Sequence, residues 1–85
     1  MAVISFDLRQ DDDYQRAYEA LRLLGFVPHL QQRQLPSTTA VGDDRGLTAA
    51  QIRDRVRTAL QAARCHPTHI FVAVITDWAL WGPEA

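Results

Sequence analysis

Asp7, Ser37 and His69 are the side chains whose types and positions best suit chemistry. Asp7 lies near the end of the stretch "AVISFDL", Ser37 precedes "TTAV", and His69 lies near the start of "THIFVAVIT". A carboxylate, a hydroxyl and an imidazole gathered at one edge of a sheet could bind a metal ion or an anion. Two alternatives stay open: Asp7 as a solvated carboxylate at a strand end, and His69 as an ordinary histidine of a turn.

Two other groups of residues have metal-ligand types but a simpler interpretation. Asp11, Asp12 and Asp13 come just before a helical pattern, where carboxylates cap the helix and interact favourably with its dipole. Metal binding is the alternative for these three. The segment "CHPTH" holds Cys65 and two histidines, but its spacing matches no strong zinc pattern and it has only one cysteine.

Arginines and tryptophans supply two candidate surfaces. Arg53, Arg57 and Arg64 fall within a narrow arc of the second predicted helix, beside its apolar face. This stripe could contact the phosphates of a nucleic acid, or the arginine stems could lie along the core edge with their heads in water. Trp78 and Trp81 lie in the tail "DWALWGPEA", where stacking on bases or packing on a partner subunit are the two interpretations.

Length and composition restrict the class of protein. Eighty-five residues, 47% of them hydrophobic, fit one small globular domain, and the formal net charge of −1 provides no bulk attraction for nucleic acid. No apolar run approaches the ~18–20 residues of a membrane span, and the N-terminal residues have no signal-peptide pattern. The single cysteine favours the reducing cytoplasm. Because so small a core is marginally stable, we expect a homodimer.

The hydrophobic pattern predicts alternating strands and helices. Residues 2–8 form a strand, and a helix follows from the aspartates to Gly25. Residues 26–34 predict a poorer edge strand, because Pro28 cannot donate to a ladder. A short strand then ends at Gly42, and Thr48 with Gln51 forms a capping box that opens the second helix. Residues 68–76 read as a buried strand, and residues 77–85 form a tail.

This order predicts a ferredoxin-like βαββαβ sandwich over residues 1–85, with a four-stranded antiparallel sheet ordered 4-1-3-2 and both helices on one face. Side chains alternate along a strand, so Val3, Ser5 and Asp7 should lie on the face without helices. The bulkier set should face the helices: Ile4, Phe6 and Leu8. A second copy of the chain would cover the bare face. The predicted dimer interface therefore comprises Val3, Ser5, Trp78 and Trp81.

Several short motifs, taken in order, resemble a known family. "ISFDL", a helix ending in "LGF", "QLPSTTAVGD", "LTAAQIRDRV" and "IFVAVI" are similar to the small CRISPR-associated proteins of the Cas-two type and to VapD-like toxins, across residues 2–75. The "DWALWG" tail resembles the uncharacterised branch of that family. Thr38-Thr39-Ala40 stand where family members usually have a bulky aromatic, and the basic loop of some members is not evident here.

The resemblance implies a homodimer with facing sheets and the two copies of Asp7 near the dyad. In family members with nuclease activity this aspartate binds a divalent metal, which implies Mg²⁺ at Asp7, with Ser37 and His69 beside it, and cleavage of RNA or DNA. Other members keep the fold as a scaffold without catalysis. The hypotheses are thus a metal-dependent endonuclease or a non-catalytic dimeric scaffold or toxin–antitoxin-type module. A small-molecule-binding domain is a third.

Overall fold

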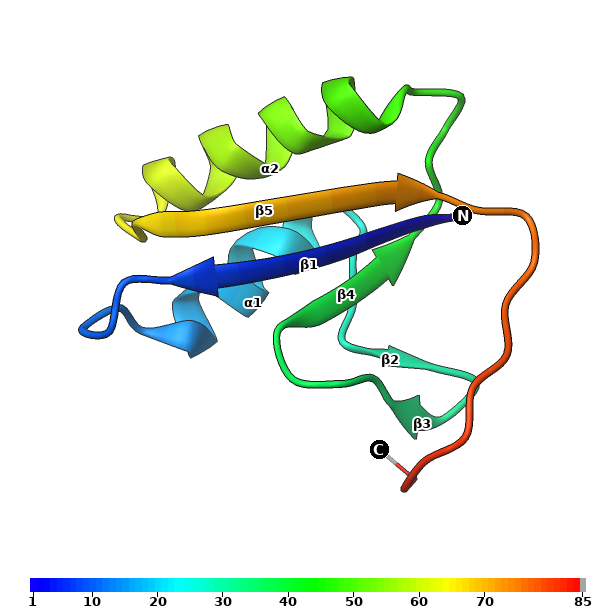
Figure 1. Cartoon of the computed structure of the whole chain (residues 1–85). Helices are drawn as coiled ribbons and strands as arrows, with labels where there is room; N and C mark the ends of the chain where they lie inside the picture. Colours follow the sequence, from blue (N-terminus) through cyan, green and yellow to red (C-terminus); the bar gives the residue numbers. More distant parts are fainter. Residues whose placement is uncertain (85) are drawn as a thin grey trace.

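The computed structural model describes residues 1–84, and within them two helices lie against an antiparallel sheet (Figure 1). Ala85, the last residue of the predicted tail, lies outside the described residues. The elements are β1 (Ala2–Leu8), α1 (Tyr14–Leu23), β2 (His29–Leu30), β3 (Arg33–Gln34), β4 (Thr39–Gly42), α2 (Ala49–Ala62) and β5 (Pro67–Val74). The predicted mixed α+β domain is therefore confirmed.

The main sheet has three strands in the order β4-β1-β5, with both pairings antiparallel. In its register Ser5 lies opposite Thr39 on β4 and opposite Phe71 on β5. The central strand β1 therefore holds the two others together, as expected for the first strand of the predicted topology. A register shift between Asp7 and Leu8 marks a bulge where β1 ends beside the start of β5.

The prediction of four strands in one sheet was wrong, because the segment expected as the edge strand 26–34 divides in two. Val27 exchanges two backbone hydrogen bonds of 2.9 Å with Val41 of β4, which makes an isolated bridge to the main sheet. Pro28 follows and has no N–H to continue the ladder. The chain then leaves the sheet and forms the separate β2–β3 hairpin, whose turn residues Gln31 and Gln32 have φ of 50° and 64°.

The core lies between the helices and one face of the main sheet. Alternate residues of β1 point into it: Ala2, Ile4, Phe6 and Leu8 are all buried. The ring of Phe6 lies 6.3 Å from that of Tyr14 and 5.7 Å from that of Tyr18, measured between centroids. The helices contribute further large apolar groups, namely Leu21 from α1 and Ile52, Val56 and Leu60 from α2, and Phe26 adds another from the segment after α1.

The tail after β5 returns to the small hairpin rather than to the main sheet (Figure 1). Gln34 donates its N–H to the carbonyl of Pro83 at 3.0 Å, and a side-chain nitrogen of Arg33 lies 2.8 Å from the carbonyl of Gly82. An isolated bridge also joins Arg33 to Glu84. Trp81, between these contacts and β5, is 97% exposed, so this tryptophan is packed against nothing in its own chain.

Candidate functional site

The face of the main sheet opposite the helices carries the predicted site. By the strand register, its residues on β1 are Val3, Ser5 and Asp7, and its residues on β5 are His69, Phe71 and Ala73. Val3 and Ala73 are partly exposed, and Phe71 is 65% exposed at the edge of the sheet. This set of six residues is called the open face below. Its apolar half and its polar half lie at opposite ends of β1.

Asp7 and His69 are neighbours at the polar end of the open face. They are cross-strand partners in the β1–β5 register, and Nδ1 of His69 lies 3.9 Å from a carboxylate oxygen of Asp7. Their side chains are 65% and 81% exposed, respectively. The expected proximity of these two residues is therefore present. At such exposure the pair interacts weakly, so it leaves both groups available to a ligand or a partner.

Ser37 lies just beyond the same end of the sheet, before the neighbouring strand β4. The carbonyl of Thr38 accepts a hydrogen bond of 3.0 Å from the N–H of Phe6, which extends the β1–β4 pairing by one residue. Ser37 is the next residue outward and is exposed. Its carbonyl accepts a bond of 2.6 Å from the hydroxyl of Thr38. Ser37 therefore lies two residues before the start of β4, just beyond the end of the β1–β4 ladder.

The three aspartates before α1 have three different roles. Asp13 caps the helix, because its side chain accepts the N–H of Gln15 at 2.9 Å. Asp11 forms an exposed ion pair of 2.7 Å with Arg9. Asp12 reaches across to the turn between α2 and β5, where its two oxygens bond to one residue, His66. Capping was predicted for all three aspartates and holds for the last of them.

The contact between Asp12 and His66 joins two loops that are distant in sequence. One oxygen of Asp12 accepts the backbone N–H of His66 at 2.6 Å, and the other lies 2.8 Å from Nδ1 of its imidazole. The Asp12 side chain is only 4% exposed. Burial alone would raise the pKa of Asp12, but the hydrogen bonds from the His66 imidazole and N–H outweigh it and hold this pKa below its usual range.

This contact predicts a loss of stability at acid pH. Since the folded-state pKa of Asp12 is below the unfolded value of about 3.9, its contribution is complete above about pH 4 and is lost as pH falls through the folded-state pKa. We expect Asp12→Asn to lower the urea midpoint at pH 7 and to flatten the decline between pH 5 and pH 2. Asp54→Asn, at an exposed carboxylate of α2, is the control. If the urea midpoint of Asp12→Asn and that of the wild-type protein fell in parallel as the pH is lowered, this role of Asp12 would be contradicted.

A zinc-type cluster in the segment "CHPTH" does not assemble. Cys65 is buried, its sulfur lies 3.8 Å from the carbonyl of Asp13, and burial raises the pKa of its thiol. Within residues 1–84 no three side chains of histidine, cysteine, aspartate or glutamate are grouped so that they could hold a metal ion. Within the described residues a metal would therefore meet at most two such side chains at one place, as at the Asp7–His69 pair.

Two arginines of the predicted stripe, Arg53 and Arg57, lie on the β5 side of α2, whereas Arg64 was wrongly expected on this helix, which ends at Ala62. Arg53 and Arg57 line a groove of about 210 Å³ together with the first residues of β5, from Pro67 to Ile70. Both guanidinium groups share a single carboxylate, that of Asp54, at 3.1 and 3.5 Å. Arg64 is exposed at the turn after α2, with φ of 61°. The groove therefore carries an excess of positive charge beside a sheet edge.

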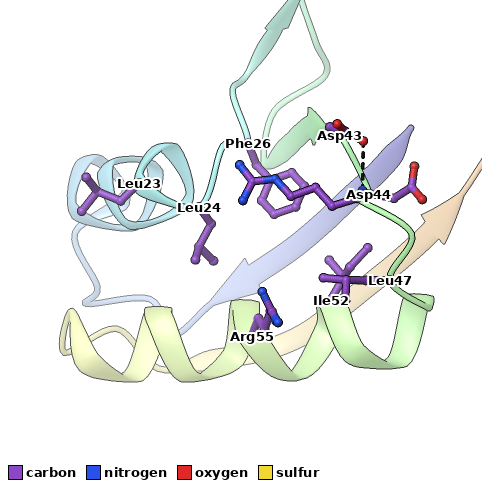
Figure 2. Close-up of a pocket in the computed structure, with 9 residues that line it drawn as sticks. Leu23, Leu24, Phe26, Asp43, Asp44, Leu47, Ile52 and Arg55 are labelled. Atoms are coloured by element: carbon purple, nitrogen blue, oxygen red, sulfur yellow. Dashed lines mark hydrogen bonds between the residues drawn. The ribbon is translucent and has the colours of Figure 1, made fainter.

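A hollow on the other side of α2 is small. It lies between the end of α1, α2 and the loop before α2, and Leu24, Phe26, Ile52 and Arg55 are among its lining residues (Figure 2). Its volume is about 100 Å³, whereas ligand pockets usually have ~300–1,000 Å³. A few water molecules would fill it, so this hollow lends no support to a small-molecule-binding function.

Comparisons with known proteins identify no relative of this chain, so its function has to be inferred from the geometry described above. No family model, no curated protein and no solved structure matches the chain. Among residues 1–84, neither helix has the length and apolar composition needed to cross a bilayer. The site thus defines a class by structure alone: a small α+β domain with one helix-covered sheet face and one face that is open over β1 and β5, whereas Val41 of β4 on that face is buried.

Proposed function

We propose that the protein is a dimeric interaction module in which the open faces of two copies pack together. The observation that carries this proposal is Phe71, a large aromatic side chain on the open face that is 65% exposed. Partly exposed Val3 and Ala73 lie nearby, and the β1–β5 register pairs them directly. Aromatic side chains are enriched in interfaces, and an exposed apolar group on a regular sheet marks an interaction surface.

A second copy is the partner that this face suits best. A twofold axis lets each Phe71 pack on apolar residues of the other copy, and such an isologous contact closes without leaving a free surface. The polar half carries one acidic and one basic group, Asp7 and His69. When two copies pack together, the Asp7 of one copy can therefore lie near the His69 of the other and does not meet only a second Asp7. Burial of Phe71 would also add apolar area to a core that is small for an independent domain.

A second candidate function, metal-dependent cleavage of nucleic acid, is favoured by the Asp7–His69 pair. Mg²⁺ prefers oxygen ligands and keeps several waters, and one chain offers it a single carboxylate at this place. Two copies of Asp7 near a dyad would offer two, and Mg²⁺ bound there would activate a water molecule for attack on a phosphodiester. His69 is placed to accept a proton. Because the second carboxylate comes from a second copy, this activity requires the dimer.

One set of measurements tests both candidates. Multi-angle light scattering at micromolar concentration should give a mass near twice the 9.6 kDa of the chain. Single- and double-stranded RNA and DNA are then incubated with the protein and Mg²⁺ or a chelator, beside Asp7→Ala. The module predicts a dimer without cleavage, whereas the nuclease predicts cleavage that needs Mg²⁺ and is lost in Asp7→Ala. A monomeric mass at all concentrations would refute both.

A further inference from the structure

One edge of the main sheet carries backbone groups without partners. Ile75 donates its N–H to the carbonyl of Met1 at 2.8 Å, which fixes the alternation along the β1–β5 ladder. From His69 onward, every second residue of β5 therefore directs its N–H and C=O groups away from the sheet; these residues are Ile70, Val72 and Val74. Within residues 1–84, none of them makes a backbone hydrogen bond beyond the ladder itself.

Beyond the bulge at its first residues, this edge lacks the usual protection against pairing with another strand. Natural edge strands are commonly blunted by charged side chains, by an internal proline or by a covering segment. In β5 the only proline is the first residue, Pro67, and the only titratable side chain is that of His69. α2 runs alongside β5 (Figure 1) but leaves the groove lined by Arg53 and Arg57 open beside the first half of the strand. The edge is therefore accessible.

We propose that the free edge of β5 binds an extended acidic peptide segment of another protein, which adds to the main sheet as a further strand. Strand addition supplies main-chain hydrogen bonds for affinity, and pockets beside the edge select side chains. Here the selecting groups are Arg53 and Arg57, whose two positive charges are balanced by one carboxylate, that of Asp54. Carboxylates of the added strand neutralise the remaining positive charge of these two arginines.

Charge decides between this occupant and a second copy of the chain. If β5 paired with β5 of another copy about a twofold axis, the two strands would run antiparallel, so each groove would lie beside the second half of the other strand. That half, Phe71 to Val74, carries no carboxylate, so the excess positive charge of the groove would stay unbalanced. An acidic peptide meets the groove with opposite charge. The contact is also separate from the dimer proposed above, because packing of two open faces leaves the edges of both sheets free. The two proposals can therefore fail independently.

The pleat of the sheet predicts the pattern of the peptide. Side chains of an added strand alternate between the helix side and the open side. On the helix side they meet Arg53 and Arg57, which favours acidic residues two apart. On the open side they lie beside Phe71, which favours apolar residues between the acidic ones. We therefore expect preference for a segment in which acidic and β-branched residues alternate.

The test uses the full chain labelled with ¹⁵N and a blocked hexapeptide of alternating glutamate and valine. We expect chemical-shift changes and slower amide exchange at Ile70, Val72 and Val74. The same peptide with lysine in place of glutamate should bind at least about tenfold more weakly. Arg53→Glu combined with Arg57→Glu should weaken binding of the glutamate peptide by about tenfold, since each substitution turns an attraction into a repulsion. Arg55→Glu, on the other side of α2, is the matched control.

Three outcomes would overturn the proposal. One is equal binding of the glutamate and lysine peptides, and another is an equal loss in Arg55→Glu and the double variant. The third is protection of the edge amides that rises with protein concentration in the absence of peptide. This last result would assign the edge to a second copy, and deletion of residues 77–84 would then show whether the tail is the strand that adds. Circular dichroism of each variant confirms that the fold is kept.

Discussion

Phe71→Glu is expected to convert the dimer into a monomer. If two open faces pack together, this ring is the largest apolar group that the contact buries, and central aromatic anchors typically contribute ~2 kcal/mol or more. Removing it should raise the dissociation constant by about 30-fold, and the new carboxylate, close to its symmetry mate, should raise it further. Sedimentation velocity over a concentration series measures the shift.

The control for this variant is Leu23→Glu. Leu23 lies on α1 and is 74% exposed, so the same exchange of an apolar side chain for a charged one is made away from the open face. We expect Leu23→Glu to sediment like the wild-type protein. Because Phe71 is already exposed in the single chain, Phe71→Glu should keep its circular dichroism spectrum. Equal effects of the two variants would show that the open face is not the interface.

The elements that follow from local chemistry could be predicted from the sequence. The capping box at the start of α2 is present in both directions: Thr48 Oγ1 accepts the N–H of Gln51 at 3.2 Å, and the Gln51 side chain accepts the N–H of Thr48 at 2.9 Å. The alternation of β1 correctly separated Ile4, Phe6 and Leu8 from the open face. Each of these predictions rests on residues within a few positions of one another.

The features that depend on contacts between distant segments could not be predicted. Pro28 indicated a weak edge strand, but only the fold shows that Val27 alone remains in the main sheet. The bond between Asp12 and His66 spans 54 positions, and no sequence spacing encodes it. The prediction put Asp7 and His69 at one edge of the sheet, and these two residues are cross-strand partners in the structure, whereas the partner of Asp12 was not predicted.

The close approach at Gly42 is a further contact of this kind, and it predicts a large loss of stability on substitution. Gly42, at the end of β4, lies against the turn that follows α1. A Cβ built at this position would overlap the carbonyl oxygen of Gly25 and would lie 2.6 Å from a ring carbon of Phe26. Real Cβ atoms do not approach backbone this closely, and Phe26 is buried, so neither neighbour can move away freely.

Gly42→Ala must therefore shift the turn at Gly25 or separate β4 from β1, since the register pairs Gly42 with the buried Ala2 at the start of β1. Overpacking of this kind costs about 3 kcal/mol, which is a large share of the ~5–15 kcal/mol that stabilises a typical small domain. Gly82→Ala is the matched control, because a Cβ there meets its nearest neighbour, the carbonyl of Gln34, at an ordinary 3.7 Å. Urea unfolding should show a loss for Gly42→Ala alone; equal midpoints for the two variants would mean that β4 and the turn after α1 are not packed so closely.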